Sequence, residues 1–172
     1  MNSQVGRRLF LGLSGAGIAA LVAGGLIPGT AASAASFKIQ RSPADWRKRL
    51  GPQRYAILRE AGTERAYSSP LNDEHRKGVF ACAGCALPLY SSAAKFESHT
   101  GWPSFWKPMP GAVIEKSDRS LLMARTEILC SRCGGHLGHV FNDGPKPTGL
   151  RYCMNGLALR FRPLDGARDR PS

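Results

Sequence analysis

Two Cys-x-x-Cys pairs, Cys82/Cys85 and Cys130/Cys133, constrain the fold of this 172-residue chain more than any other feature. Each pair presents two sulfurs from one tight turn, and two such turns complete a tetrahedron of thiolates, which suits zinc. A site of four sulfurs has no open coordination position, so its role would be structural. Two disulfides or two redox dithiols are the alternatives, but two matched pairs are more specific for zinc. The pairs are 44 residues apart, so the domain must fold to bring them together.

A fifth cysteine, Cys153, stands outside the two pairs. Side chains two residues apart on a strand point the same way, so Arg151, Cys153 and Asn155 would share one face. A guanidinium beside a thiol favours the thiolate, which is the nucleophilic form. Cys153 is therefore a candidate nucleophile, although an inert buried thiol is the commoner fate of a spare cysteine.

Two further stretches carry chemistry. His136, His139 and Asp143 lie within eight residues of one another among glycines, a composition that suits proton transfer. Trp102 and Phe105 flank Pro103 and could line a shallow apolar pocket. Both stretches also have a plain structural interpretation, because histidines and aromatic residues commonly serve only the core or the surface.

The N-terminal part of the domain favours helix. Ser42 is a good N-cap, and Gly51-Pro52 should break the helix that starts there. A second helix is expected over residues 52–61, with Gly62 as its stop. Beyond it, short apolar runs between turn residues predict antiparallel strands. The expected strands are Gly78–Ala81, Pro88–Ser91, Ala112–Glu115, Ser120–Leu129, Gly138–Phe141, Gly149–Met154 and Leu157–Pro163.

The first 34 residues have the features of an export signal. Arg7-Arg8 precedes an uncharged apolar stretch that runs to Ile27, and Ala32-Ser33-Ala34 is a small-x-small cleavage pattern. The paired arginines are typical of the twin-arginine type, which predicts a periplasmic or otherwise exported protein. An uncleaved membrane anchor is the alternative, but five glycines in that stretch make a poor span. We expect no stable membrane insertion after cleavage.

The remaining chain is expected to be a linker over 35–41, one domain over 42–163 and a polar tail over 164–172. The net charge of +12 raises the question of nucleic acid. The basic residues are scattered rather than clustered, so a solvated basic surface is the better interpretation and no specific nucleic-acid binding is expected.

Taken together, these motifs resemble the B-type methionine sulfoxide reductases over roughly residues 42–163. The resemblance rests on the segment from Trp46 to Glu64, both cysteine pairs and three further motifs. Those are Gly101-Trp102-Pro103-Ser104-Phe105, the run from Gly135 to Pro145, and Arg151-Tyr152-Cys153-x-Asn155. It implies a mainly β fold, with two antiparallel sheets pinned by a four-cysteine zinc site and short N-terminal helices.

The resemblance also implies roles for individual residues. Cys153 would attack the sulfoxide sulfur of methionine-R-sulfoxide in a protein or peptide, pass through a sulfenic acid and be recycled by a thioredoxin-like thiol reductant. The substrate would be held by Trp102, with Phe105 beside it. His139, aided by His136 and Asp143, would protonate or hydrogen-bond the sulfoxide oxygen. Arg151 and Asn155 match the residues that flank the nucleophile.

Two positions depart from the family's pattern. Thr100 stands where members with a resolving cysteine often carry it, and Met154 replaces a frequent β-branched residue. The expected protein is a monomeric enzyme that repairs oxidised exported proteins. A non-enzymatic zinc-ribbon module is the alternative, but such a module has no use for a lone cysteine between arginine and asparagine.

Overall fold

The structure is a computed structural model that describes residues 37–118 and 125–164. The expected signal peptide, and the tail from residue 165 onward, lie outside these residues. The described residues belong to one compact unit. Within the described ranges, no helix has the length and apolar character needed to cross a membrane.

The helical part begins as the sequence predicts. Helix α1 spans Pro43–Glu60, and the hydroxyl of Ser42 accepts the backbone N–H of Asp45 at 3.1 Å. Gly51 leaves the helical conformation with φ 69° and ψ 171°, so α1 consists of two segments joined by a kink. The predicted break is confirmed, because glycine adopts this conformation without a steric penalty and proline follows it.

The end of α1 differs by one residue from the expectation. Ala61, not Gly62, takes the left-handed conformation with φ 52° at the C-cap. The helix buries one face that includes Trp46, Leu50 and Leu58. That face packs against β7 and against the 3-10 turn at Gly156–Ala158.

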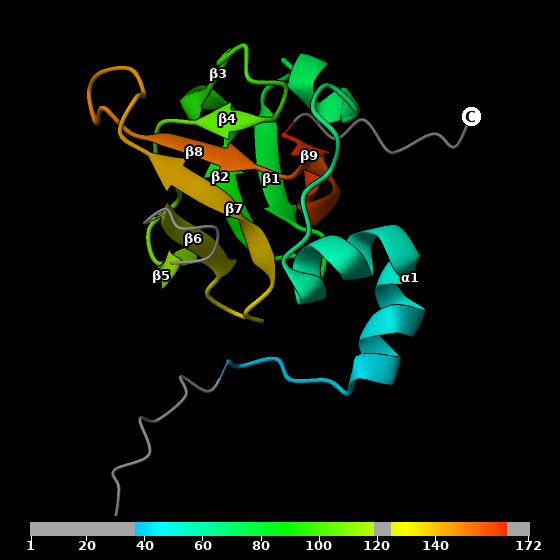
Figure 1. Cartoon of the computed structure of the whole chain (residues 1–172). Helices are drawn as coiled ribbons and strands as arrows, with labels where there is room; N and C mark the ends of the chain where they lie inside the picture. The colour runs from blue at the N-terminus through cyan, green and yellow to red at the C-terminus, as the bar shows by residue number, and fades with distance from the viewer. Residues whose placement is uncertain (1–36, 119–124, 165–172) are drawn as a thin grey trace, which may run out of the picture. The chain divides into compact units, whose positions relative to one another are not determined.

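Two antiparallel sheets make up the rest of the domain, which confirms the predicted fold class (Figure 1). The first has the order β2-β1-β9, and the second has the order β3-β4-β8-β7-β6-β5. The strands are β1 Gly78–Cys82, β2 Pro88–Ser91, β3 Lys95–Phe96, β4 Ser104–Phe105, β5 Val113–Asp118, β6 Arg125–Cys130, β7 His136–Phe141, β8 Arg151–Met154 and β9 Leu159–Pro163. Short 3-10 turns occupy Pro70–Asp73, Ser92–Ala94 and Gly156–Ala158.

The two shortest strands, β3 and β4, were not predicted. Each has two residues, too few to show an alternating pattern. They matter to the site, because β4 pairs Ser104 with Cys153 of β8. Strand β5 also runs three residues past its predicted end at Glu115, as far as Asp118.

The sheets pack through an aromatic core. Phe105 of β4 lies between Phe80 of β1 and Tyr90 of β2, with ring centroids 5.0 Å and 4.4 Å away. The Tyr90 hydroxyl donates to the sulfur of Met154 at 3.1 Å. Phe105 is fully buried in this core, and so its predicted contact with substrate is wrong. Adjacent residues of a strand face opposite sides, so β4 turns Phe105 inward when it turns Ser104 toward Cys153.

The segment predicted as a linker is packed onto the domain where it is described. The N–H of Ile39 donates to the carbonyl of Arg132 at 3.0 Å. The ring of Phe37 lies so close to Gly134 that a Cβ there would come within 2.3 Å of it. Residues 37–39 therefore lie against the turn that carries the second cysteine pair.

Candidate active site and metal centre

The four paired cysteines meet as the sequence predicts. Their sulfurs lie within 4.8 Å of one another, with 3.7 Å between Cys82 and Cys133 and 3.5 Å between Cys85 and Cys130. These distances are far longer than a disulfide bond of about 2.05 Å. Four sulfurs bound to one zinc at about 2.3 Å would stand about 3.8 Å apart, so the cluster fits that ion. It is a possible metal site.

The two cysteine turns have equivalent backbones. Gly134 follows the second pair with φ 66°, and Ala86 follows the first with φ 62°. The N–H of each donates at 2.8 Å to the carbonyl of the first cysteine of its pair, Cys130 or Cys82. The alanine therefore adopts the strained conformation that the glycine adopts freely.

The four-cysteine cluster joins both sheets and the helix. Cys82 ends β1 of the three-stranded sheet, and Cys130 ends β6 of the six-stranded sheet. From α1, Arg59 donates to the carbonyl of Cys133 and Arg49 to the carbonyl of Gly84, each at 2.9 Å. A metal at this point would hold three parts of the fold together.

Cys153 lies elsewhere, in a cavity of about 170 Å³ on the six-stranded sheet. Strand register places Cys153 between His139 of β7 and Ser104 of β4. A Cβ on Gly138 would come within 2.1 Å of the Cys153 carbonyl, so only glycine allows these strands to pair so closely. The cavity is lined by Thr63, Trp102, Arg125, Gly138, His139, Phe141, Cys153 and Asn155.

One buried residue, Glu64, holds two walls of this cavity. Its carbonyl accepts the indole N–H of Trp102 at 3.1 Å, and its N–H donates to the side-chain oxygen of Asn155 at 3.0 Å. Its carboxylate accepts the backbone N–H groups of Gly156 and Leu157. Asn155 also donates to the carbonyl of Leu137 at 3.2 Å. Asn155 therefore serves as a strut between segments as well as a cavity wall.

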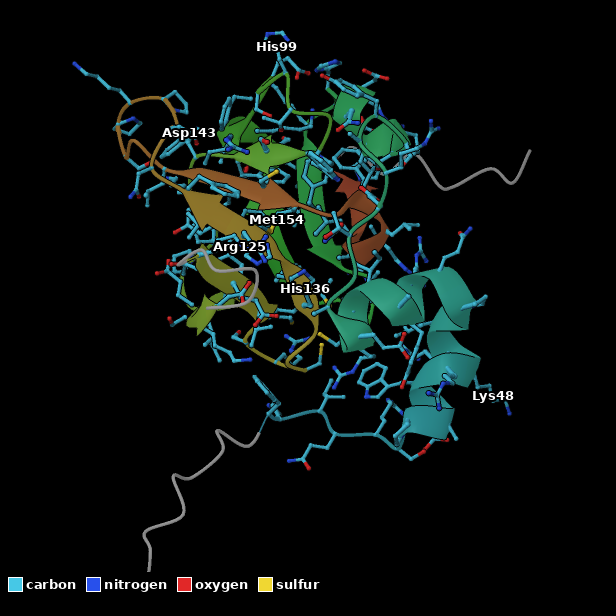
Figure 2. The ribbon with its side chains drawn as sticks, in the orientation of Figure 1. Lys48, His99, Arg125, His136, Asp143 and Met154 are labelled. Carbon is cyan, nitrogen blue, oxygen red and sulfur yellow. The ribbon has the colours of Figure 1, made fainter. Side chains whose placement is uncertain are left out.

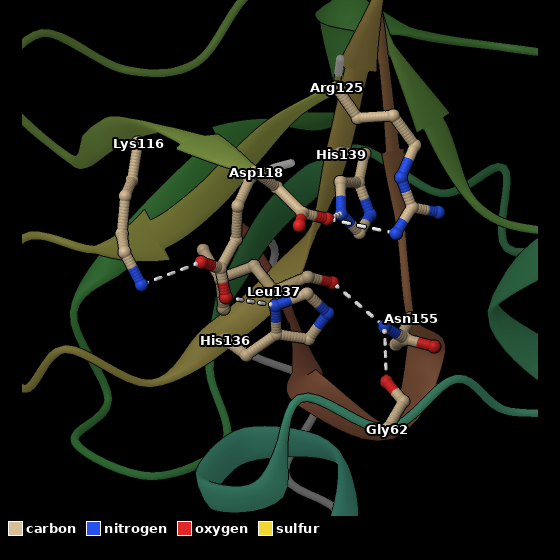
Figure 3. Close-up of polar contacts among 9 residues, drawn as sticks. Gly62, Lys116, Asp118, Arg125, His136, Leu137, His139 and Asn155 are labelled. Atoms are coloured by element: carbon tan, nitrogen blue, oxygen red, sulfur yellow. Dashed lines mark hydrogen bonds and ion pairs between the residues drawn. The ribbon is translucent and has the colours of Figure 1, made fainter. Parts of the chain in front are cut away.

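The carboxylate partner of His139 is Asp118. The ring nitrogen Nε2 of His139 lies 3.0 Å from Oδ2 of Asp118, which also accepts from Arg125 at 2.8 Å (Figure 3). A carboxylate in this position fixes the orientation of the ring. His139 lines the cavity, as expected of a group that acts on the substrate.

The companion histidine, His136, lies deeper and outside the cavity lining. Its Nδ1 is 2.7 Å from Oε1 of Glu127, and Lys116 donates to the other carboxylate oxygen at 3.3 Å (Figure 3). Burial lowers the pKa of His136, against the opposing effect of Glu127. The ring centroids of the two histidines are 5.4 Å apart. His136 is thus placed to support His139 rather than to touch a substrate.

A bulge in β7 brings both histidines to one side of the sheet. In the pairing with β6, Leu129 faces His136 but Ile128 faces Gly138, so Leu137 is an extra residue. Without that insertion, residues three apart on a strand would face opposite sides. Glu127 pairs with His139 and bonds His136, so a single residue of β6 contacts both.

Asp143 does not join the histidines. Its carboxylate accepts two bonds from Arg151, at 2.8 Å and 2.9 Å, and the guanidinium lies over the ring of Phe141. The Arg151 hydrogen bonds lower the pKa of Asp143 and raise that of Arg151. Figure 2 shows Asp143 and His136 toward opposite ends of the six-stranded sheet. The predicted cooperation of Asp143 with the histidines is wrong, because β7 carries the chain away between them.

The prediction that Arg151 favours the thiolate of Cys153 also needs correction. Burial raises the pKa of its thiol, and this effect outweighs the opposing influences of Thr100, Arg151 and Ser104. The guanidinium of Arg151 forms an ion pair with Asp143, which compensates much of its charge. Burial therefore favours the neutral thiol, and activation of Cys153 depends on more than the neighbouring guanidinium.

No motif in the sequence identifies Asp118, Glu127 or Arg125 as site residues. A carboxylate at a strand position opposite a histidine is a weak signal, and the pairing of β5, β6 and β7 is needed to see it. Glu64 ends the Trp46–Glu64 segment that resembles the family, but no neighbouring residue distinguishes it from a surface carboxylate.

The fold and the site define a class of protein with a four-cysteine cluster between two sheets and one thiol in an aromatic cavity. Comparison with known proteins agrees: a SelR domain matches residues 50–163. "Peptide methionine sulfoxide reductase MsrB" of Leptospira interrogans is 52% identical over 128 residues, covering 74% of this chain and 98% of that protein. The proteins of the same name from Agrobacterium fabrum and Thiobacillus denitrificans are 53% and 55% identical, over 75% and 73% of this chain and 96% of each relative. The chain belongs to the SelR-domain family, the family of these methionine sulfoxide reductases.

Proposed function

We propose that this protein reduces methionine-R-sulfoxide in proteins or peptides to methionine. The observation that carries the proposal is the position of Cys153 in a cavity whose walls include Trp102 and His139, in a chain of this family. Cys153 is also the one cysteine outside the four-cysteine cluster.

The reaction removes one oxygen atom from the substrate. The sulfur of Cys153 attacks the sulfoxide sulfur and forms an S–S bond, and the sulfoxide oxygen takes up two protons and leaves as water. A water molecule then attacks the Cys153 sulfur, the S–S bond breaks, methionine leaves, and Cys153 becomes a sulfenic acid. The sulfoxide oxygen is a poor leaving group and needs a proton, a step for which general acids typically supply 10²–10⁴ in rate. His139, paired with Asp118, is the group in the cavity suited to that step.

Substrate orientation falls to Trp102 and Asn155. An indole face is a suitable wall for the ε-methyl group of the substrate, because it offers apolar area at a fixed angle. The hydrogen bond from Trp102 to the Glu64 carbonyl supports that angle. Asn155 would hold the far wall in place.

Recycling uses an external thiol, such as a thioredoxin-like protein. A first thiol condenses with the sulfenic acid and releases water, and a second thiol reduces the mixed disulfide, which returns Cys153 to its reduced form. No other cysteine among the described residues lies outside the four-cysteine cluster, and Thr100 occupies the place next to the Cys153 sulfur, 3.8 Å away. The four-cysteine cluster would carry zinc in a structural role.

The protein would act outside the cytoplasm as a monomer that repairs oxidised exported proteins. The support is the Arg7-Arg8 motif and the cleavage pattern at Ala32-Ser33-Ala34. N-terminal sequencing of the mature protein from a periplasmic fraction would test this. A chain that keeps Met1 in the membrane fraction would favour the anchored alternative.

The activity itself is tested with resolved epimers of a methionine sulfoxide peptide and a chemical dithiol as reductant. We expect turnover of the R epimer and none of the S epimer. Equal rates with both, or turnover of S alone, would overturn the proposed specificity. Absence of turnover by a zinc-loaded, folded protein would overturn the activity.

A further inference from the structure

A chain of three hydroxyl groups ends at the sulfur of Cys153. The Oγ of Ser104 lies 2.7 Å from that of Ser98, which lies 2.9 Å from Oγ1 of Thr100. Thr100 Oγ1 is 3.8 Å from the Cys153 sulfur. At the other end, the Ser104 hydroxyl donates to the carbonyl of Trp102 at 3.1 Å. The chain thus runs from a backbone carbonyl to the nucleophile.

The loop that carries Thr100 is fixed from both sides. The carbonyl of Gly101 accepts from the N–H of Tyr67 at 2.7 Å and from the side chain of Asn72 at 3.1 Å. The Tyr67 hydroxyl donates to the carbonyl of His99 at 2.7 Å. Gly101 has φ 91°, and a Cβ there would come within 2.8 Å of Tyr67. The Thr100 hydroxyl is therefore held in place before any substrate binds.

We propose that Thr100, Ser98 and Ser104 form a reversible hydrogen-bond chain that serves both protonation states of Cys153. The proposal rests on the proposed role of Cys153 as the nucleophile. Thr100 contacts the reacting sulfur and is a catalytic residue. Ser98 is a positioning residue that acts through Thr100, and Ser104, which pairs with Cys153 on β8, holds the other end of the chain.

The donors and acceptors balance in both states. In the thiol state, the S–H donates to Thr100, Thr100 to Ser98, Ser98 to Ser104, and Ser104 to the Trp102 carbonyl. In the thiolate state, the Thr100 hydroxyl donates to the sulfur, and the Ser98 hydroxyl donates to Thr100. Each hydroxyl keeps its proton and only rotates. A hydroxyl is both donor and acceptor, so the switch requires no other movement.

The chain is not a route for the proton that leaves the thiol. It ends on a carbonyl, which accepts a hydrogen bond but does not carry a proton away. That proton must leave on the cavity side, where His139 of β7 and Arg125 of β6 line the wall. Arg151, on the strand of Cys153, is bonded to Asp143. Thr100 is therefore the neutral donor best placed to stabilise the thiolate, since hydrogen bonds to a charged group are the stronger kind.

The test is the rate at which iodoacetamide alkylates Cys153 in the zinc-loaded full chain, measured from pH 6 to pH 10 by mass spectrometry. Thr100→Val keeps the shape and removes the hydroxyl. We expect the rate at pH 7 to fall about tenfold and the pH profile to move to higher pH. Thr100→Ser should restore the rate. Ser98→Ala, which leaves Thr100 without its partner, should cost about threefold.

Thr148→Val is the matched control, because it removes a hydroxyl that bonds the Trp106 carbonyl on an exposed loop. It should alkylate like the unmodified protein. A normal rate in Thr100→Val, or an equally slow rate in Thr100→Ser, would overturn the proposal. Circular dichroism and zinc content show whether Thr100→Val folds. If it does not, a normal pH profile of alkylation in Ser98→Ala would overturn the proposal. Alkylation needs no sulfoxide, so failure of the proposed enzyme activity would be seen separately.

Discussion

The four-cysteine cluster and the Cys153 site use one kind of side chain for opposite purposes. In the cluster, each pair of sulfurs comes from one turn with its own backbone hydrogen bond, and the fold only has to bring two finished turns together. Around Cys153, the neighbours on β4, β7 and the loop at Thr100 are at least 14 residues away in sequence. The first site is largely encoded by spacing, whereas the second exists only after the sheet has formed.

Cys130→Ser should have the largest effect, because it removes one corner of the cluster. Structural zinc contributes about 10–16 kcal/mol in small zinc domains, comparable to the whole stability of a domain. We expect loss of metal and an unfolded or aggregated chain. Metal analysis and circular dichroism check this. One metal equivalent on a stable Cys130→Ser protein would show that the cluster is not what holds the fold.

Cys153→Ser is the matched exchange at the other site, and it should leave zinc content and fold unchanged. Turnover should fall by more than about a thousandfold, since the hydroxyl that remains is a poor nucleophile. Epimer-resolved turnover is the measurement. Residual activity above that level would point to another nucleophile.

His139→Ala should slow single-turnover reduction by about 10²–10⁴, the range of general acid catalysis. Arg151→Ala should cost only about threefold. Added thiolate is partly offset by lower intrinsic nucleophilicity, and the guanidinium is largely directed to Asp143. Rapid-quench kinetics with the two variants side by side separates these effects. The reverse ranking would mean that forming the thiolate is the harder step.

Glu64→Gln should lower kcat/KM about tenfold while the chain keeps its zinc. The NH₂ group that replaces one carboxylate oxygen cannot accept a hydrogen bond, so one of the two bonds from the backbone N–H groups of Gly156 and Leu157 is lost, at a cost of about 1–3 kcal/mol. Trp102 and Asn155 should then be misplaced. Steady-state kinetics checks this against Glu60→Gln, an exposed control of equal charge change. Equal values of kcat/KM in the two variants would show that Glu64 does not position the walls of the cavity.

Asp143→Asn should have the smallest effect, and in the opposite direction. Removing this carboxylate leaves the charge of Arg151 uncompensated near the sulfur, which should lower the pKa of Cys153. The thiol is largely protonated at neutral pH, so its alkylation at pH 7 should speed up about twofold. Asp73→Asn is the control for net charge. Slower alkylation would show that Asp143 orients Arg151 toward the sulfur instead of drawing its charge away.

The helix and most strands could be predicted because their signals are local. Ser42, Gly51 and the alternating apolar runs act within a few residues, through capping, backbone freedom and side-chain alternation. The two-residue strands β3 and β4 carry no such signal. Their absence from the prediction explains the error at Phe105, whose direction is set by pairing with β8.

The amino-acid sequence by itself determined the two cysteine turns, the kinked helix and the identity of the spare thiol. Each of these depends on residue types at short, fixed spacing. Only the tertiary structure decided that Asp118 rather than Asp143 serves His139, that Glu64 holds both Trp102 and Asn155, and that burial outweighs Arg151 at the thiol. These are contacts between distant segments, created by a strand bulge and by sheet packing. Their energies depend on distance and desolvation, and residue spacing along the chain specifies neither.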